Sequence, residues 1–163
     1  MFVFSQQCAL VSAFSCSLML CGIANAQSDQ NRDSLRGIKS ARVVVSIDDA
    51  LATLNVDEST IKAVVENKLR KSGLVVDDAP GADALIHVQV QGGPYHDDES
   101  VCAISVAIEV NQFCELKNRK AVMAMTWWVR RTMAVPSNVT SKMVNDGAGG
   151  ATGRLVEEWK AVN

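Results

Sequence analysis

Residues 101–135 read VCAISVAIEVNQFCELKNRKAVMAMTWWVRRTMAV, and this stretch decides the fold. Apolar residues alternate with small or polar ones in both halves, and the polar residues 117–120 separate the halves. Alternation with a period of two is typical of a strand that has one buried face. The stretch therefore predicts an antiparallel hairpin of two long strands, 101–115 and 121–135, joined by a turn at 117–120.

The apolar faces of the two strands predict how the strands pair. One face of the first strand carries Cys102, Ile104, Val106, Ile108 and Val110. One face of the second carries Met123, Met125, Trp127, Val129, Met133 and Val135. Both apolar faces lie on the same side of the sheet when the numbers of two residues paired across the hairpin add to an odd value, such as 237. This register places Glu109 opposite Trp128 and diagonal to Arg130. Trp127 then belongs to the core, and Trp128 lies on the outer face.

Upstream of the hairpin, the chain predicts a strand, a helix and another strand. Residues 41–47 are short and β-branched, which indicates a buried strand. Asp57 precedes an apolar run with helical spacing and Gly73 follows it. We therefore expect a helix over 58–71, with Asp57 as the N-cap and Gly73 as the left-handed stop. Residues 83–91 alternate and place His87 on the polar face of a strand.

Downstream of the hairpin, Pro136 ends the second strand and Ser137 can cap a last helix. Its apolar positions include Val139, Met143, Leu155 and Trp159. Four glycines fall between Gly147 and Gly153, and each costs about 1 kcal/mol relative to alanine inside a helix. They either let the helix approach the sheet closely or break it in two. The local penalty favours a helix with a weak or broken middle.

These elements follow the order β-α-β-β-β-α, which predicts an α+β fold. Because consecutive strands are joined by short links, we expect a mainly antiparallel meander with the two helices packed on one face. Residues 39–163 are expected to form a single domain, since no repeat or proline-rich linker divides them. Residues 27–38 are polar and aperiodic, which predicts a flexible leader.

The first 26 residues carry no charged side chain and indicate an export signal. An apolar run from Cys8 to Ile23 ends in the small-x-small pattern of residues 24–26, so we expect cleavage after Ala26 and a periplasmic or secreted protein. The n-region departs from the rule because it has no Lys or Arg. An uncleaved anchor is one alternative. Lipidation at Cys21 is another, although bulky leucines precede it where a lipobox takes small residues.

Composition excludes some functional classes. The chain has 163 residues, a net charge of −2 and 48% hydrophobic residues, which is ordinary globular composition. A disordered chain and a strongly basic nucleic-acid binder are therefore excluded. No cofactor motif is present, and contact with a membrane is expected only through the export signal.

One resemblance rests on STIKAVVENKLRKSGLVV (59–76) followed by ADALIHVQVQ (82–91). This pattern resembles small periplasmic α/β accessory domains such as the N-terminal domain of TolB. There, a helix ending in Leu-x-x-Ser-Gly leads through an Ala-Asp turn into a strand. The matching residues here are Leu69, Ser72, Gly73, Ala82 and Asp83. The resemblance covers roughly residues 41–135, implies an envelope domain used for interaction, and brings no active-site residue with it.

The outer face of the sheet is the candidate binding surface, formed by Trp128, Arg130, His87 and Glu109. An exposed tryptophan beside an arginine is typical of interaction hot spots. We therefore expect a non-catalytic module that binds a protein partner or a second copy of itself. Trp128 has an alternative role as a cross-strand partner on a sheet face that binds nothing.

Two alternatives make the protein an enzyme or a metal binder. His87 with Glu109 has the chemistry of a general base and acid, as in a small hydrolase or ligand-binding protein, but no nucleophile motif accompanies the pair. The 92–99 loop carries the possible metal ligands His96, Asp97, Asp98 and Glu99. Adjacent ligands on one loop cannot all converge on one ion, so a solvated turn is favoured over a metal site.

Cys102 and Cys114 are the two cysteines left after the export signal, and both are expected to face the core. An even pair in an oxidising compartment permits a disulfide. On a straight strand, however, they would lie about 40 Å apart. A disulfide requires Cα atoms within about 7 Å. An intramolecular bond therefore needs the strand to fold back near 110–113, while free thiols and an intermolecular bond are the alternatives.

Overall fold

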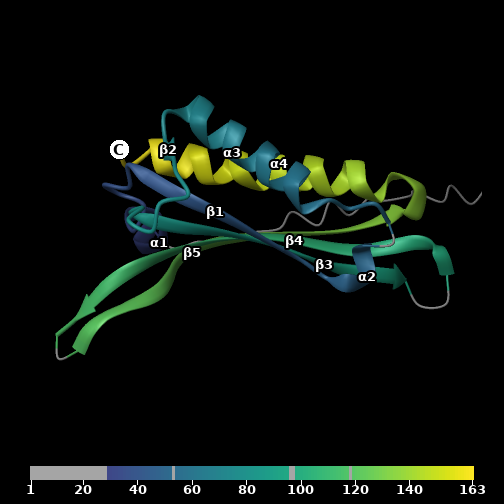
Figure 1. Ribbon diagram of the computed structural model, residues 1–163, viewed down its shortest axis with the longest axis horizontal. Helices are drawn as coiled ribbons and strands as arrows, with labels where there is room; N and C mark the ends of the chain where they lie inside the picture. Colours follow the sequence, from purple (N-terminus) through teal and green to yellow (C-terminus); the bar gives the residue numbers. More distant parts are fainter. Residues whose placement is uncertain (1–28, 53, 96–97, 118) are drawn as a thin grey trace, which may run out of the picture.

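A computed structural model describes residues 29–52, 54–95, 98–117 and 119–163. The helices and strands, in chain order, are α1 (Asp29–Asp33), β1 (Ser40–Ile47), α2 (Asp49–Ala52), α3 (Glu58–Ser72), β2 (Val75–Val76), β3 (Ala84–Tyr95), β4 (Asp98–Leu116), β5 (Arg119–Pro136), the 3-10 turn η1 (Ser137–Val139) and α4 (Thr140–Lys160). The predicted α+β class and the two main helices are confirmed. Figure 1 shows α3 and α4 side by side on one face of the sheet.

The sheet has the strand order β2-β1-β3-β4-β5. Strands β3, β4 and β5 are antiparallel neighbours, as expected, so the sheet is mostly antiparallel. Strand β1 is the exception to the antiparallel order, because it runs parallel to both β2 and β3. The chain leaves β1, crosses the sheet through α3 and returns in the same direction, which is how parallel neighbours are joined.

The predicted register of the β4–β5 hairpin is confirmed along its first half. Glu109 pairs with Trp128, and the same register runs from Val101 opposite Pro136 to Val110 opposite Trp127. The next pair is Asn111 opposite Met125, so Thr126 is an extra residue that forms a β-bulge. The Thr126 hydroxyl donates to the Gln112 side-chain oxygen at 2.6 Å and lies 3.3 Å from the Val110 carbonyl.

The bulge overturns the prediction that Met123 and Met125 are core residues. Met123 pairs with Phe113, and the two methionines are 49% and 52% exposed. Past Thr126, the hairpin projects beyond the helices, at the lower left of Figure 1. We name residues 111–125 the arm. Trp127, immediately inside the bulge, is fully buried as predicted.

Helix α3 begins and ends at the residues that the sequence predicts. Asp57 accepts hydrogen bonds from the Ser59 hydroxyl at 2.6 Å and from the Thr60 hydroxyl and N–H at 2.7 Å. These bonds, led by the Ser59 hydroxyl, lower the pKa of Asp57 from 3.8 to about 2 because they favour the ionised form. At the other end, Gly73 has φ 101° and donates its N–H to the Arg70 carbonyl.

Helix α4 is continuous, so the predicted break at Gly147–Gly153 is wrong and the close-approach alternative holds. A Cβ at Gly147 would lie 3.0 Å from the Met133 methyl carbon and 3.4 Å from Val106. The glycines thus let α4 lie close to the sheet and to α3. The packing of α4 against the sheet and α3 offsets the helix-propensity cost of its glycines. Ser137 is not the expected cap, because it begins η1 and α4 starts at Thr140 without a side-chain cap.

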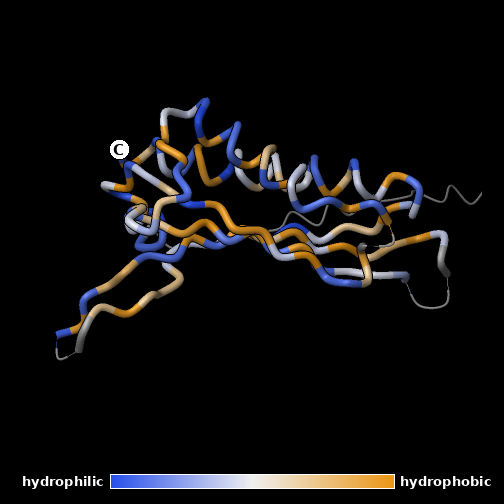
Figure 2. The backbone as a smooth tube through the Cα atoms, in the orientation of Figure 1, coloured by the Kyte–Doolittle hydropathy of each residue, from blue (hydrophilic) through white to orange (hydrophobic). Residues whose placement is uncertain are grey.

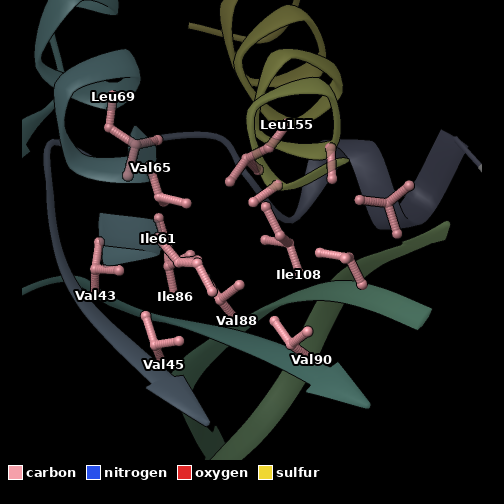
Figure 3. Packing of buried hydrophobic residues seen from close by; sticks show 14 of the residues in the cluster. Val43, Val45, Ile61, Val65, Leu69, Ile86, Val88, Val90, Ile108 and Leu155 are labelled. Carbon is pink, nitrogen blue, oxygen red and sulfur yellow. The ribbon is translucent and has the colours of Figure 1, made fainter. Parts of the chain in front are cut away.

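The core lies between the two long helices and the sheet. Figure 3 shows Ile61, Val65 and Leu69 of α3 and Leu155 of α4 pointing at valine and isoleucine side chains of the strands. In Figure 2, hydrophobic segments recur along the strands and along both long helices. Leu35 and Ile38 are also buried in this core, which differs from the flexible leader expected for 27–38. No helix within the described ranges has the length and hydropathy to span a bilayer.

Candidate functional site

The strand register brings the four predicted binding residues together on the sheet face opposite the long helices. His87 of β3 pairs with Glu109 of β4, and Glu109 pairs with Trp128 of β5. Val44 of β1 completes this row across four strands. Arg130 lies in the next row, which also contains Ser46, Gln89 and Ala107. The four residues predicted from the sequence are therefore neighbours; we name this surface the open face.

A polar network occupies the centre of the open face. The Ser46 hydroxyl lies 2.7 Å from His87 Nε2, and His87 Nδ1 lies 3.6 Å from a carboxylate oxygen of Glu109. The Gln89 amide lies 3.4 Å from His87 Nδ1 and donates to Glu109 at 3.5 Å. His87 and Glu109 are both partly buried by these neighbours. The network holds the imidazole and the carboxylate in place on a flat part of the sheet.

Ser46 is the residue of this network that the sequence reasoning missed. Its hydroxyl, the His87 ring and the Glu109 carboxylate stand in the order that nucleophilic catalysis uses. That chemistry also needs N–H donors for a developing oxyanion. The backbone N–H groups around these three residues serve the ladders between β1, β3 and β4. The alternation of 40–47 puts Ser46 on a definite face, but only the parallel pairing of β1 with β3 brings it to His87.

Trp128 and Arg130 form the side of the open face that lies on β5. Trp128 is 41% exposed although it sits beside the fully buried Trp127. Arg130 is exposed in the following row, and Arg42 is exposed on the far strand β1. The two guanidinium groups therefore border the Trp128 row from either side, whereas the carboxylate of Glu109 is engaged by His87 and Gln89.

At the end of the sheet where the arm begins, the open face is hollowed. A groove of about 210 Å³ lies between the 79–83 loop and the arm, and is lined on the arm side by Phe113 and Met123. Asp83 at its edge accepts the N–H groups of Lys39 and Ser40, each at 2.9 Å. These bonds lower the pKa of Asp83, with the Lys39 N–H contributing most. The Ala-Asp turn quoted from the sequence thus ties β3 to the start of β1.

The predicted metal ligands of the 92–99 loop lie mostly beyond the structure. His96 and Asp97 are outside the described residues, as are the side chains of Asp98 and Glu99. Within the described ranges, no three His, Cys, Asp or Glu side chains gather as a metal site. Strands β3 and β4 approach each other closely at Gly92, where an added Cβ would overlap the Ala103 carbonyl oxygen.

Cys102 and Cys114 carry free thiols in the structure. Cys102 is buried as predicted, and its sulfur lies 3.4 Å from the Ser137 hydroxyl. Cys114 lies on the arm and is only partly buried, so its predicted place in the core is wrong. Strand β4 runs through both positions without folding back. The geometry that an intramolecular disulfide needs is therefore absent from β4.

No protein-family model matches the chain, and no curated protein matches it. Three solved structures are similar to it at low identity. A PelC dodecamer from Paraburkholderia phytofirmans has 18% identity and a TM-score of 0.46, with 76% of this chain and 87% of that chain covered. A minor lipoprotein from Acinetobacter baumannii has 6% identity and a TM-score of 0.43, covering 77% and 93% of the two chains. Rare lipoprotein B from Shewanella oneidensis has 13% identity and a TM-score of 0.37, covering 74% and 94%.

These likenesses are distant, since every TM-score is below 0.5. Two of the three are named as lipoproteins, and the resemblance found is not to TolB specifically.

Proposed function

We propose that this protein is an exported, non-catalytic module that binds a protein partner through its open face. The supporting observation is Trp128, a large aromatic side chain that is 41% exposed on the open face of the edge strand β5. Neither of the two long helices covers this face, because both pack on the other side (Figure 1). Residues 1–26 supply the export that delivers the module to the periplasm or the exterior.

The chemistry of the open face defines the partner. Trp128 offers exposed apolar area, and Arg42 and Arg130 offer charge on either side of its row. The one carboxylate in the row, Glu109, already has His87 and Gln89 as neighbours. A complementary surface is therefore apolar where it meets Trp128 on β5 and carries carboxylates where it meets Arg42 and Arg130. Buried tryptophan and arginine side chains supply most of the energy in such interfaces.

Site-specific photocrosslinking in the exporting cell tests this proposal. A photoreactive residue at position 128 should give a discrete crosslinked product that disappears when Arg130→Ala is added. The matched control is position 75, because Val75 is also apolar and exposed but lies on β2, at the opposite edge of the sheet. Equal crosslinking at 75 and 128, or a product indifferent to Arg130→Ala, would refute the proposal.

Sedimentation velocity across a concentration series identifies whether the partner is a second copy. Self-association that Trp128→Ala abolishes would mean that copies of this chain bind one another through the open face. If the protein is a monomer at every concentration and the crosslink still depends on Arg130, the partner is a different protein.

A hydrolase is the second candidate, and the contacts of His87 with Ser46 and Glu109 are the observation that favours it. A catalytic Ser46–His87–Glu109 triad predicts turnover of an activated ester such as p-nitrophenyl acetate, with a loss of at least about 1,000-fold in Ser46→Ala. The binding proposal predicts that Ser46→Ala and the unaltered protein hydrolyse the ester at the same background rate. Saturable turnover that requires both Ser46 and His87 would establish the enzyme instead.

A further inference from the structure

We propose that the arm, residues 111–125, docks onto the surface of an anionic lipid bilayer. This inference concerns a different surface from the open-face row and does not depend on it. Nine large apolar side chains are exposed in the described chain, and five of them lie on the arm: Phe113, Leu116, Val122, Met123 and Met125. So dense a cluster on one projecting element marks an interaction surface.

The arm is apolar on both of its faces. Met123 and Phe113 are paired and share the face that continues the open face. Val122 precedes Met123 in the strand, so it projects from the opposite face and is also exposed. A protein partner docked on one face would leave the other apolar face in water. A lipid boundary contacts both faces of an inserted ribbon, so it suits this distribution.

The charge of the arm complements an anionic surface. Lys117 is exposed directly after β4, and Arg119 and Lys120 are the first residues of β5, so the sequence around the turn of the arm holds three basic residues and one acidic residue, Glu115. The arm therefore has a net charge of +2 in a protein whose net charge is −2. Lysine and arginine stems lie along apolar surface while their charged ends reach lipid head groups. Each cation near an anionic membrane adds attraction that salt screens.

The position of the arm gives it access to such a surface. It extends past the helices at one end of the sheet, as Figure 1 shows. The Ser34 hydroxyl donates to the Thr126 carbonyl at 3.1 Å, so the beginning of the described chain is attached at the root of the arm.

Vesicle co-sedimentation tests the inference on the chain beginning at Gln27, which keeps every described residue. We expect binding to phosphatidylcholine vesicles that contain phosphatidylglycerol, weakening as salt increases, and little binding to phosphatidylcholine alone. Replacing the three basic residues together (Lys117→Gln, Arg119→Gln, Lys120→Gln) should weaken binding on the order of 100-fold, since each contributes about a factor of five. Phe113→Ser with Met123→Ser should weaken it roughly 10-fold or more.

Two matched controls distinguish binding through the arm from an effect of the protein's overall charge or exposed apolar area. The first control replaces three exposed lysines elsewhere, Lys71, Lys142 and Lys160, with glutamine and makes the same change in net charge. The second replaces Val75 and Val139 with serine. Both should bind as the unaltered protein does. Equal losses in controls and arm variants, or equal binding with and without phosphatidylglycerol, would overturn the inference.

A second measurement tests whether the arm binds another copy of the protein instead of a bilayer. Concentration-dependent self-association that Phe113→Ser with Met123→Ser removes, with no vesicle binding, would assign the arm to contact between copies and overturn the lipid proposal. Circular dichroism melting of each variant verifies folding, and exposed arm substitutions should leave the melting curve almost unchanged.

Discussion

The two halves of strand β5 have similar sequences and opposite environments. From Trp127 to Val135, the alternating apolar residues Trp127, Val129 and Val135 are buried beneath α4 and its neighbours. From Arg119 to Met125, the alternation continues, yet Met123 and Met125 are about half exposed on the arm. Alternation therefore predicts a strand and the residues that share a face, but it does not predict whether anything covers that face.

The point where the two halves meet explains the difference. Thr126 is the unmatched residue between the Val110–Trp127 and Asn111–Met125 pairs. A bulge bends a strand and re-aims the side chains beyond it. Met123 and Met125 are thereby moved to the face that continues the open face, away from both long helices.

Trp127→Ala should destabilise the protein by about 3–5 kcal/mol, because it empties a fully buried site. It also removes the 2.6 Å hydrogen bond from the indole N–H to the buried Glu158. Met125→Ala, two residues away on the arm, should change stability by less than about 0.5 kcal/mol. Urea denaturation measures both, and comparable losses would mean that the arm is packed as tightly as the covered half.

Gly147→Leu should cost about 1–3 kcal/mol, since the new side chain overpacks the contact of α4 with Met133 and Val106. Gly149→Ala is the matched change on the same helix, where the new Cβ would meet Val64 at an ordinary 3.5 Å. It should stabilise by up to about 1 kcal/mol through helix propensity. If thermal melts show both changes to be neutral, α4 does not need its close approach to cover the sheet.

Thr126→Val should cost about 1 kcal/mol, because it removes the hydroxyl that bonds Gln112 at the root of the arm. Thr132→Val on the same strand is the control, at an exposed position in the covered half. Hydrogen exchange should quicken in the arm of Thr126→Val and stay unchanged around Trp127. Faster exchange throughout β5 would show that the bulge does not separate the two halves.

The smallest expected effect is a pH dependence from the cap of α3, far from both halves of β5. The pKa of Asp57 is about 2 in the folded protein, below its usual 3.8. Because the pKa of Asp57 is lower in the folded than in the unfolded protein, its ionised carboxylate stabilises the fold above about pH 4. This stabilisation is lost as the pH falls from about 4 to 2. Asp57→Ala should remove this part of the acid dependence. Parallel stability curves for the variant and the unaltered protein between pH 5 and pH 2 would contradict the assignment.

The candidate site shows the same division between local and long-range information. The sequence alone placed His87, Glu109 and Trp128 on the outer face, because hairpin register follows from the apolar patterns of two adjacent strands. It missed Ser46, whose contact with His87 depends on a parallel pairing between strands separated by α3. No local pattern encodes that register, since the crossover connection sets it.

What the sequence determined by itself is therefore what short-range physics controls. The caps of α3 at Asp57 and Gly73, the β4–β5 register and the burial of Trp127 follow from hydrogen bonds and alternation within a few residues or one hairpin. Only the tertiary structure decided the continuity of α4, the exposure of the arm and the burial of Leu35. Each of these depends on packing against residues that are distant in the sequence. The sheet packs against the glycines of α4, the two long helices do not extend over the arm, and the core residues of the helices and strands bury Leu35.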